Sequence, residues 1–278
     1  MSNYFETHIQ EAVNNADIHG FCAGDVNQRV LFPSHTGGCD WTLEAVIGCT
    51  FKCSYCLAKV CSMAFGELTD LSYWNHIKIK KDILFQFNNE LKKVKTGQFI
   101  WVCDLTDPFM IGRPDVTRLH LDLVNKMNVV GIFAKVLTKG FLPKELFNLS
   151  VKNKIGVSAS ILDDGFRKIY EKNTIPTLVR LDRLKQFSDA GFYTWVSIAP
   201  YPSPDLFKYE PIEQFLEKIS WTNRIVFDAF GYFGPIKEEN KDFYFEISSK
   251  IRNFCKAHDI EFNNLSKIRE LVKERIGI

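Results

Sequence analysis

The sequence lacks the features that would place it in a membrane or outside the cell. No stretch approaches the roughly 18 uninterrupted apolar residues that a membrane-spanning helix needs. The start of the chain, Met1–Asn15, has no basic segment followed by an apolar run, so we predict no secretory signal. We therefore expect a soluble, cytoplasmic protein with no membrane partner.

The sequence also lacks a strong charge of one sign and any low-complexity tract. Its 278 residues carry 35 Lys and Arg against 33 Asp and Glu, which leaves a formal net charge of +2. A protein that binds DNA through its overall charge is strongly basic, so this net charge does not predict DNA binding. A local basic groove is still compatible with it. With 46% hydrophobic residues, the chain can build one large core domain with short extensions.

Short, dense apolar runs alternate with amphipathic stretches from residue 41 onward. Such runs are typical of buried parallel strands, and the stretches between them have helical period, as over Thr117–Met127 and Thr177–Ala190. Repeated strand–helix–strand order with right-handed crossovers predicts a barrel or part of one, with its chemistry at the carboxyl ends of the strands. The predicted strands are Trp41–Ile47, Phe99–Cys103, Gly131–Leu137, Lys154–Ala159, Tyr193–Ile198 and Arg224–Phe230.

This pattern predicts an α/β protein of three parts. Residues 1–40 form an N-terminal extension, residues 41–235 the barrel, and residues 236–278 a C-terminal helical extension. The last part reads as two polar-rich helices, Glu239–His258 and Asn264–Ile276.

Three cysteines follow the first predicted strand in the spacing C-x3-C-x2-C, at Cys49, Cys53 and Cys56. In a reducing compartment, clustered cysteines are more often metal ligands or catalytic groups than disulfides. Iron–sulfur clusters are held by cysteine thiolates, usually four, so three ligands leave one iron open to a cofactor or substrate. The alternative is a zinc site completed by Cys39, Cys61 or a histidine. Zinc motifs usually combine two C-x2-C-like groups at a distance along the chain, and this sequence has no second group.

The triple, with Tyr55 before its last cysteine, resembles the signature of the radical S-adenosylmethionine superfamily. Further motifs over roughly residues 40–235 resemble the spore photoproduct lyase-like branch of that superfamily. The resemblance implies a partial (β/α)6 radical-SAM barrel, a [4Fe-4S] cluster on the three cysteines, and reductive cleavage of S-adenosylmethionine to a 5′-deoxyadenosyl radical. The motifs are T-D-P at 106–108, T-K at 138–139, serines at 158 and 160, and E-x4-P-x3-R at 171–180.

The resemblance also implies roles for the motif residues in binding the cofactor. Thr106 and Asp107 would accept the ammonium of its methionine part, and Lys139 would neutralise its carboxylate. Ser158 and Ser160 would bond the carboxylate or the ribose, and Arg180 would bind a carboxylate directly or by holding Glu171. For three of these residues, a purely structural role is the alternative: a turn at Asp107, a solvated helix start at Lys139, and a surface ion pair at Arg180.

Two interpretations of Cys103 are open: a hydrogen-atom donor and a core residue. A thiol has a weak S–H bond, and the photoproduct lyases carry near this position a cysteine that returns a hydrogen atom to a substrate radical. Cysteine is also among the most buried residue types, so Cys103 is equally a core residue. The other cysteines (22, 39, 61 and 255) and all six histidines read as core or neutral positions.

The substrate does not follow from the barrel. The resemblance favours a nucleobase or nucleoside, free or in nucleic acid, that a lyase or isomerase repairs or modifies. Two alternatives remain: a radical enzyme acting on an amino acid, peptide or other small molecule, and a non-catalytic, zinc-binding barrel. A radical enzyme would also need an electron donor of the flavodoxin or ferredoxin type.

Overall fold

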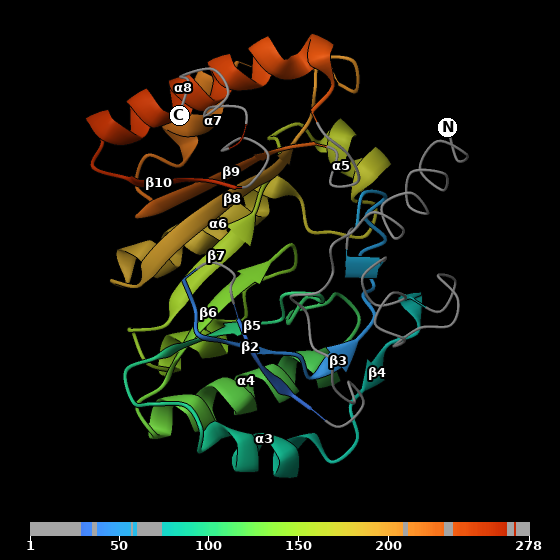
Figure 1. Cartoon of the computed structure of the whole chain (residues 1–278), viewed down its shortest axis with the longest axis vertical. Helices are drawn as coiled ribbons and strands as arrows, with labels where there is room; N and C mark the ends of the chain where they lie inside the picture. Colours follow the sequence, from blue (N-terminus) through green and yellow to red (C-terminus); the bar gives the residue numbers. More distant parts are fainter. Residues whose placement is uncertain are drawn as a thin grey trace.

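The computed structural model describes residues 29–34, 38–56, 58–59, 74–207, 211–230, 236–265 and 270. Within them an eight-stranded sheet runs in the order β1-β2-β5-β6-β7-β8-β9-β10, and β3 pairs with β4 beside it (Figure 1). All neighbours from β2 to β10 are parallel, and only β1 is antiparallel to the sheet. The strands are β1 (Leu31–Pro33), β2 (Trp41–Leu43), β3 (Val46–Ile47), β4 (Lys78–Ile79), β5 (Phe99–Val102), β6 (Phe133–Thr138), β7 (Lys154–Ser158), β8 (Tyr193–Tyr201), β9 (Arg224–Ala229) and β10 (Glu261–Asn264).

The helices connect the parallel strands and pack on the sheet through their apolar stripes. α3 and α4 lie at one end of the sheet, and α7 and α8 lie at the other (Figure 1). In α4 the buried residues include Val116, Leu123 and Met127, which recur at helical spacing. None of the helices in the described ranges is long and apolar enough to cross a bilayer. The helices are α3 (Ile83–Leu91), α4 (Pro114–Val129), η3 (Lys144–Asn148), α5 (Asp164–Tyr170), α6 (Thr177–Asp189), α7 (Ile212–Lys218), η4 (Glu238–Asn240) and α8 (Lys241–Ala257).

The predicted fold class is confirmed, because each of the six predicted runs contains a strand of one curved, mostly parallel sheet. The predicted helices Thr117–Met127 and Thr177–Ala190 correspond to α4 and α6, and Glu239–His258 corresponds to η4 and α8. The boundaries of the three predicted parts stay a prediction.

Three details of the prediction were wrong. The run Trp41–Ile47 is two strands, because Glu44 and Ala45 leave the ladder and bond instead to the backbone of residues 30 and 80. The strand predicted over Phe99–Cys103 ends at Val102, because Cys103 has a left-handed backbone with φ 62°. The predicted helix Asn264–Ile276 begins inside β10, and most of its remainder lies outside the described residues.

The inner face of the curved sheet is filled by two tryptophans and a lysine. β5 and β8 are three strand spacings apart, roughly 14 Å in a flat sheet. The rings of Trp101 and Trp195 nevertheless lie 5.4 Å apart, so the sheet must curl toward this face. The buried Lys135 ammonium lies 4.9 Å from both ring centres. These three side chains form a floor below the carboxyl ends of the strands.

Gly156 makes room for this floor, which gives a prediction. A Cβ added to Gly156 would lie 2.3 Å from Cε2 of the Trp195 ring. Gly156→Ala should therefore lower the free energy of unfolding by about 1–3 kcal/mol through overpacking, measured by urea denaturation. In a Trp195→Leu background, which removes the clashing ring, the same change should cost much less. Equal costs in the two backgrounds would contradict the assignment of the floor.

Candidate active site

Residues 48–56, which carry the three cysteines, form the cysteine loop. The loop begins where the backbone at Gly48 closely approaches the backbone at Trp74. Gly48 has φ 91°, and a Cβ there would lie 2.5 Å from the backbone oxygen of Trp74. The next N–H, that of Cys49, donates to this same oxygen over 3.0 Å. Glycine is thus required for the turn that brings the loop out of β3.

A segment more than a hundred positions later holds the loop in place. Cys53 forms an isolated antiparallel bridge with Glu171, just after α5. The Asn173 side-chain amide donates to the backbone oxygen of Thr50 over 2.8 Å. Sequence spacing alone does not reveal this support, because it comes from the tertiary fold.

Cys49, Cys53 and Cys56 are free thiols on this loop, and each is partly exposed. Burial raises the pKa of all three, and the ammonium of Lys139 opposes this at Cys53. Each thiol must therefore lose a proton when it binds a metal. Among the described residues, no three or more His, Cys, Asp or Glu side chains are arranged to hold a single metal ion. A cluster that offers each thiolate its own iron does not need such convergence.

A buried carboxylate, that of Glu171, connects the cysteine loop to the barrel. Its Oε1 accepts hydrogen bonds from the Tyr55 hydroxyl, from Lys139 Nζ over 3.0 Å and from Ser160 Oγ over 3.2 Å. Its Oε2 pairs with the Arg180 guanidinium over 3.2 Å. Burial would raise the pKa of Glu171, but the charges of Lys139 and Arg180 outweigh it and hold that pKa at about 2. Glu171 is therefore ionised, and the sequence-based site contained it only as a partner of Arg180.

Arg180 holds Glu171 and is not a surface ion pair. Its side chain is 0% exposed. Beyond Glu171, its guanidinium donates to the backbone oxygen of Ser158 and, over 3.1 Å, to the hydroxyl of Thr177. Arg180 therefore contacts Glu171, and its role toward a cofactor stays a prediction.

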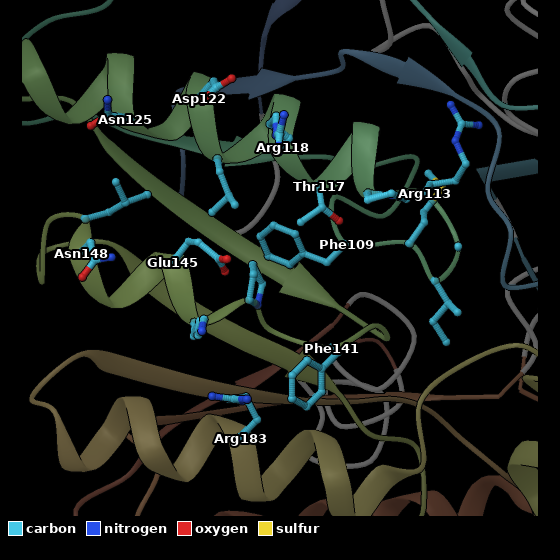
Figure 2. Close-up of a pocket in the computed structure, with 18 residues that line it drawn as sticks. Phe109, Arg113, Thr117, Arg118, Asp122, Asn125, Phe141, Glu145, Asn148 and Arg183 are labelled. Atoms are coloured by element: carbon cyan, nitrogen blue, oxygen red, sulfur yellow. The ribbon is translucent and has the colours of Figure 1, made fainter.

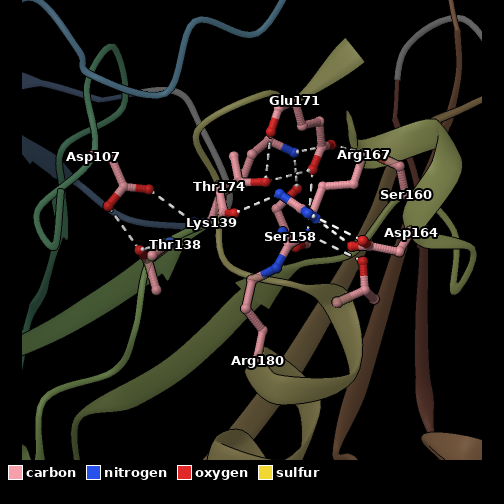
Figure 3. Close-up of polar contacts among 12 residues, drawn as sticks. Asp107, Thr138, Lys139, Ser158, Ser160, Asp164, Arg167, Glu171, Thr174 and Arg180 are labelled. Atoms are coloured by element: carbon pink, nitrogen blue, oxygen red, sulfur yellow. Dashed lines mark hydrogen bonds and ion pairs between the residues drawn. The ribbon is translucent and has the colours of Figure 1, made fainter. Parts of the chain in front are cut away.

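Asp107 joins the ends of β5 and β6. Its Oδ1 accepts from the N–H of Phe109 over 2.9 Å, which is the predicted local turn, and from the Thr138 hydroxyl over 2.7 Å. Its Oδ2 accepts from the N–H of Lys139 over 2.8 Å (Figure 3). Burial raises the pKa of Asp107, and these three hydrogen bonds oppose that effect. The Asp107 carboxylate therefore fixes where the Lys139 side chain begins.

The side chain of Lys139 is not a solvated helix start. It is 15% exposed, and its ammonium contacts Ser158 Oγ at 2.6 Å as well as Glu171. The same ammonium lies 5.4 Å from the centre of the Tyr55 ring. Nearby, the buried hydroxyl of Thr106 has no hydrogen-bond partner among the described residues. The predicted cofactor-binding side chains thus lie at the carboxyl ends of strands or on the cysteine loop, except Arg180, which lies on α6.

Cys103 is buried and faces a histidine of α4. Its sulfur lies 3.0 Å from His120 Nε2, and His120 Nδ1 lies 2.9 Å from the backbone oxygen of Val116. If Nδ1 carries the ring proton toward that oxygen, Nε2 accepts the thiol proton. Burial raises the pKa of Cys103 and lowers that of His120 to about 4, so both groups are neutral near pH 7. The sequence predicted a core position for His120 but gave no signal of this contact.

The other predicted core cysteines and histidines fall into three groups. Cys39 packs with Trp101 and Trp195 in the floor, and Cys255 is buried against the main core. His76 and His258 are exposed. Cys22, Cys61, His8, His19 and His35 lie outside the described residues.

A groove of about 970 Å³ lies on the outer side of the barrel, between α4 and the segment from Phe141 to Leu149 (Figure 2). Phe109 and Phe141, which follow the two loop motifs, line it. The Arg183 guanidinium lies over the Phe141 ring at 4.5 Å. None of the predicted site residues lines this groove, although the backbone oxygen of Ile111, which does, accepts from the Thr50 hydroxyl of the cysteine loop over 3.4 Å.

Comparison with solved structures agrees with this architecture. A spore photoproduct lyase double mutant with bound AdoMet and dinucleoside spore photoproduct matches with a TM-score of 0.60 and 13% identity, over 84% of this chain and 78% of that chain. A tyrosine-to-phenylalanine mutant of spore photoproduct lyase matches with a TM-score of 0.58 and 12% identity over the same shares. This chain has the spore photoproduct lyase fold. No family model and no curated protein matches the sequence.

Within this fold, loss of Arg180 should be costly. Arg180→Met would leave the Glu171 carboxylate buried with one cation fewer, so we expect a loss of about 3–5 kcal/mol in the free energy of unfolding. Urea denaturation at pH 7 measures it. Arg183→Met, on the same helix and without an ion pair among the described residues, is the control and should cost under about 1 kcal/mol. Equal losses would contradict a buried Glu171 charge.

His120 predicts a pH dependence of stability. Its folded pKa of about 4 lies below its ordinary value of 6.5, so the native state binds fewer protons between these values. The contribution of His120 to the free energy of unfolding should be fully present above pH 6.5 and should fall by up to about 3 kcal/mol as the pH approaches 4. His120→Gln should flatten this slope in denaturation midpoints. His258→Gln is the control, since exposed His258 makes the same contact with a backbone oxygen four residues earlier. An unchanged slope in His120→Gln would refute this assignment.

Proposed function

We propose that this protein is a radical S-adenosylmethionine enzyme that holds a [4Fe-4S] cluster on Cys49, Cys53 and Cys56. The observation that carries the proposal is the Glu171 carboxylate, which bonds to the cysteine loop through Tyr55 and to the barrel through Lys139. This arrangement keeps three free thiols beside a set of polar groups at the mouth of a partial barrel. The spore photoproduct lyase fold supports it, since one matched structure contains AdoMet.

The residues of the site fit both the [4Fe-4S] cluster and S-adenosylmethionine. Three free thiols without a fourth cysteine in the loop suit a cluster with one open iron. The Thr106 hydroxyl is buried without a partner among the described residues, and such a group gains stability when a ligand supplies one. When bound, the cluster would supply the electron that cleaves S-adenosylmethionine to methionine and a 5′-deoxyadenosyl radical.

The chain's own residues would bind and orient the cofactor. Thr106 and Asp107 would accept hydrogen bonds from the methionine ammonium. Lys139 would bind the methionine carboxylate with the proton not used by Glu171 and Ser158. Ser158 and Ser160 lie on the same side and would bond the carboxylate or the ribose. Arg180 would act through Glu171, and Tyr55 would keep its ring against the Lys139 ammonium.

The substrate we propose is a nucleobase or nucleoside, free or in nucleic acid, on which the enzyme acts as a lyase or isomerase in repair or modification. The matched lyase structure carries a dinucleoside lesion, which supports this class for a chain of the same fold. Cys103 would return a hydrogen atom to the substrate radical. Its thiol first has to leave the contact with His120, because both groups are buried. A flavodoxin or ferredoxin type protein would supply the electron.

Anaerobic reconstitution tests the proposal. The wild-type protein should contain about four iron and four labile sulfide per chain and should form 5′-deoxyadenosine from S-adenosylmethionine under a strong reductant. Cys53→Ala should lose both iron and product. Asp107→Ala should keep the iron but weaken S-adenosylmethionine binding at least tenfold, whereas Asp115→Ala, on an exposed surface pair, should change neither. Zinc without labile sulfide in the wild-type protein would end the proposal.

The substrate class is tested in the same assay with S-adenosylmethionine carrying deuterium at C5′. Transfer of the label to nucleosides or oligonucleotides supports the nucleobase class, and a salt-sensitive affinity for oligonucleotides supports nucleic acid over free nucleosides. Label exchange with amino acids or peptides only would favour the alternative class.

A further inference from the structure

Glu44 bonds to the loop that carries Thr106 and Asp107. It follows the last residue of β2 and is 5% exposed. Its Oε1 accepts two consecutive backbone N–H groups, from Asp104 over 2.5 Å and from Leu105 over 2.8 Å. Neither the sequence motifs nor the fold comparison draws attention to this residue.

The loop needs such a partner because of how it leaves the strand. Cys103, the first residue after β5, has a left-handed backbone with φ 62°, which costs a non-glycine residue of the order of 1 kcal/mol. Successive N–H groups beside a left-handed residue point toward one side and form a concave site for an acceptor oxygen. The Glu44 carboxyl occupies this concave site and satisfies both donors. The loop therefore keeps a strained conformation that holds Thr106 and Asp107 in fixed positions.

Glu44 also belongs to the segment that leads into the cysteine loop. Only Ala45, β3 and Gly48 separate it from Cys49. The contact with residues 104 and 105 thus connects the chain that carries the three thiols to the chain that carries Thr106 and Asp107. Glu171 connects the same cysteine loop to Lys139 from the opposite side.

We propose that Glu44 is a positioning residue that sets the distance between the thiols and the groups that bind the methionine ammonium. The proposal rests on the proposed function for its cofactor, and on the two hydrogen bonds for its geometry. Glu44 does not touch the cofactor and acts only through the loop 103–107.

The chemical form of Glu44 decides which variants are informative. Burial raises the pKa of Glu44 to about 8, with the two backbone N–H groups opposing, so the side chain is mainly a neutral acid at pH 7. Its Oε1 accepts both hydrogen bonds, and its Oε2 is buried without a partner among the described residues. Glutamine offers the same acceptor oxygen at the same length. Methionine fills the same space but cannot accept.

The experiment compares Glu44→Gln and Glu44→Met in the anaerobically reconstituted protein. Glu44→Gln should bind S-adenosylmethionine within threefold of wild type, and Glu44→Met should bind it at least tenfold more weakly. Iron content should be unchanged in both, measured beside the affinity. Glu261→Met is the control: Glu261 on β10 accepts from the Tyr193 hydroxyl and pairs with Arg224, at the amino ends of β8 and β9 and away from this loop. It should leave the affinity unchanged.

Amide hydrogen exchange gives a readout that needs no cofactor. The amides of Asp104 and Leu105 should be protected in wild type and in Glu44→Gln, and at least tenfold less protected in Glu44→Met. Wild-type affinity in a folded Glu44→Met, or unprotected amides in the wild-type protein, would overturn the proposal. If wild type binds no S-adenosylmethionine, the proposed function fails, while the exchange data still decide whether Glu44 anchors the loop.

Discussion

The buried Glu171 carboxylate is the constraint on which the rest of the site depends. A charge that is 2% exposed must be matched by cations and hydrogen-bond donors, or the folded state loses several kcal/mol. Its partners come from four separate segments: the cysteine loop, the end of β6, the end of β7 and helix α6. None of these segments can move without leaving the charge unsatisfied. The same carboxylate therefore fixes the cysteine loop relative to the barrel.

The barrel explains why these segments meet at one place. Parallel strands joined by helical crossovers bring all their carboxyl ends to one edge, where Asp107, Lys139, Ser158 and Ser160 follow β5, β6 and β7. Below them, the floor of Trp101, Lys135 and Trp195 closes the inner face, so polar chemistry is confined to the mouth. The groove outside α4 is lined by neither the thiols nor the residues of the Glu171 network.

The sequence was sufficient for the features that local pattern encodes. Buried parallel strands need continuous apolar runs, so all six central strands could be predicted, and the spacing of Cys49, Cys53 and Cys56 identified the loop. β10 was missed because Glu261-Phe-Asn-Asn carries little apolar pattern, and the break at Glu44 was missed because the residues around it are apolar. The contact between Cys103 and His120, and the bridge from Cys53 to Glu171, depend on tertiary packing. No spacing rule reveals such contacts.

The charges of the network explain why a buried arginine accompanies a lysine that already has a carboxylate partner. Glu171 and Asp107 both lie beside Lys139, so a single ammonium would leave one of these two buried carboxylates without a matching charge. Arg180 adds a second cation that contacts Glu171 on its other oxygen, and the two cations then balance the two carboxylates. Because an unmatched buried charge is costly, this balance stabilises the folded site. A ligand that carries both an ammonium and a carboxylate, such as the methionine moiety of the proposed cofactor, would leave the balance unchanged.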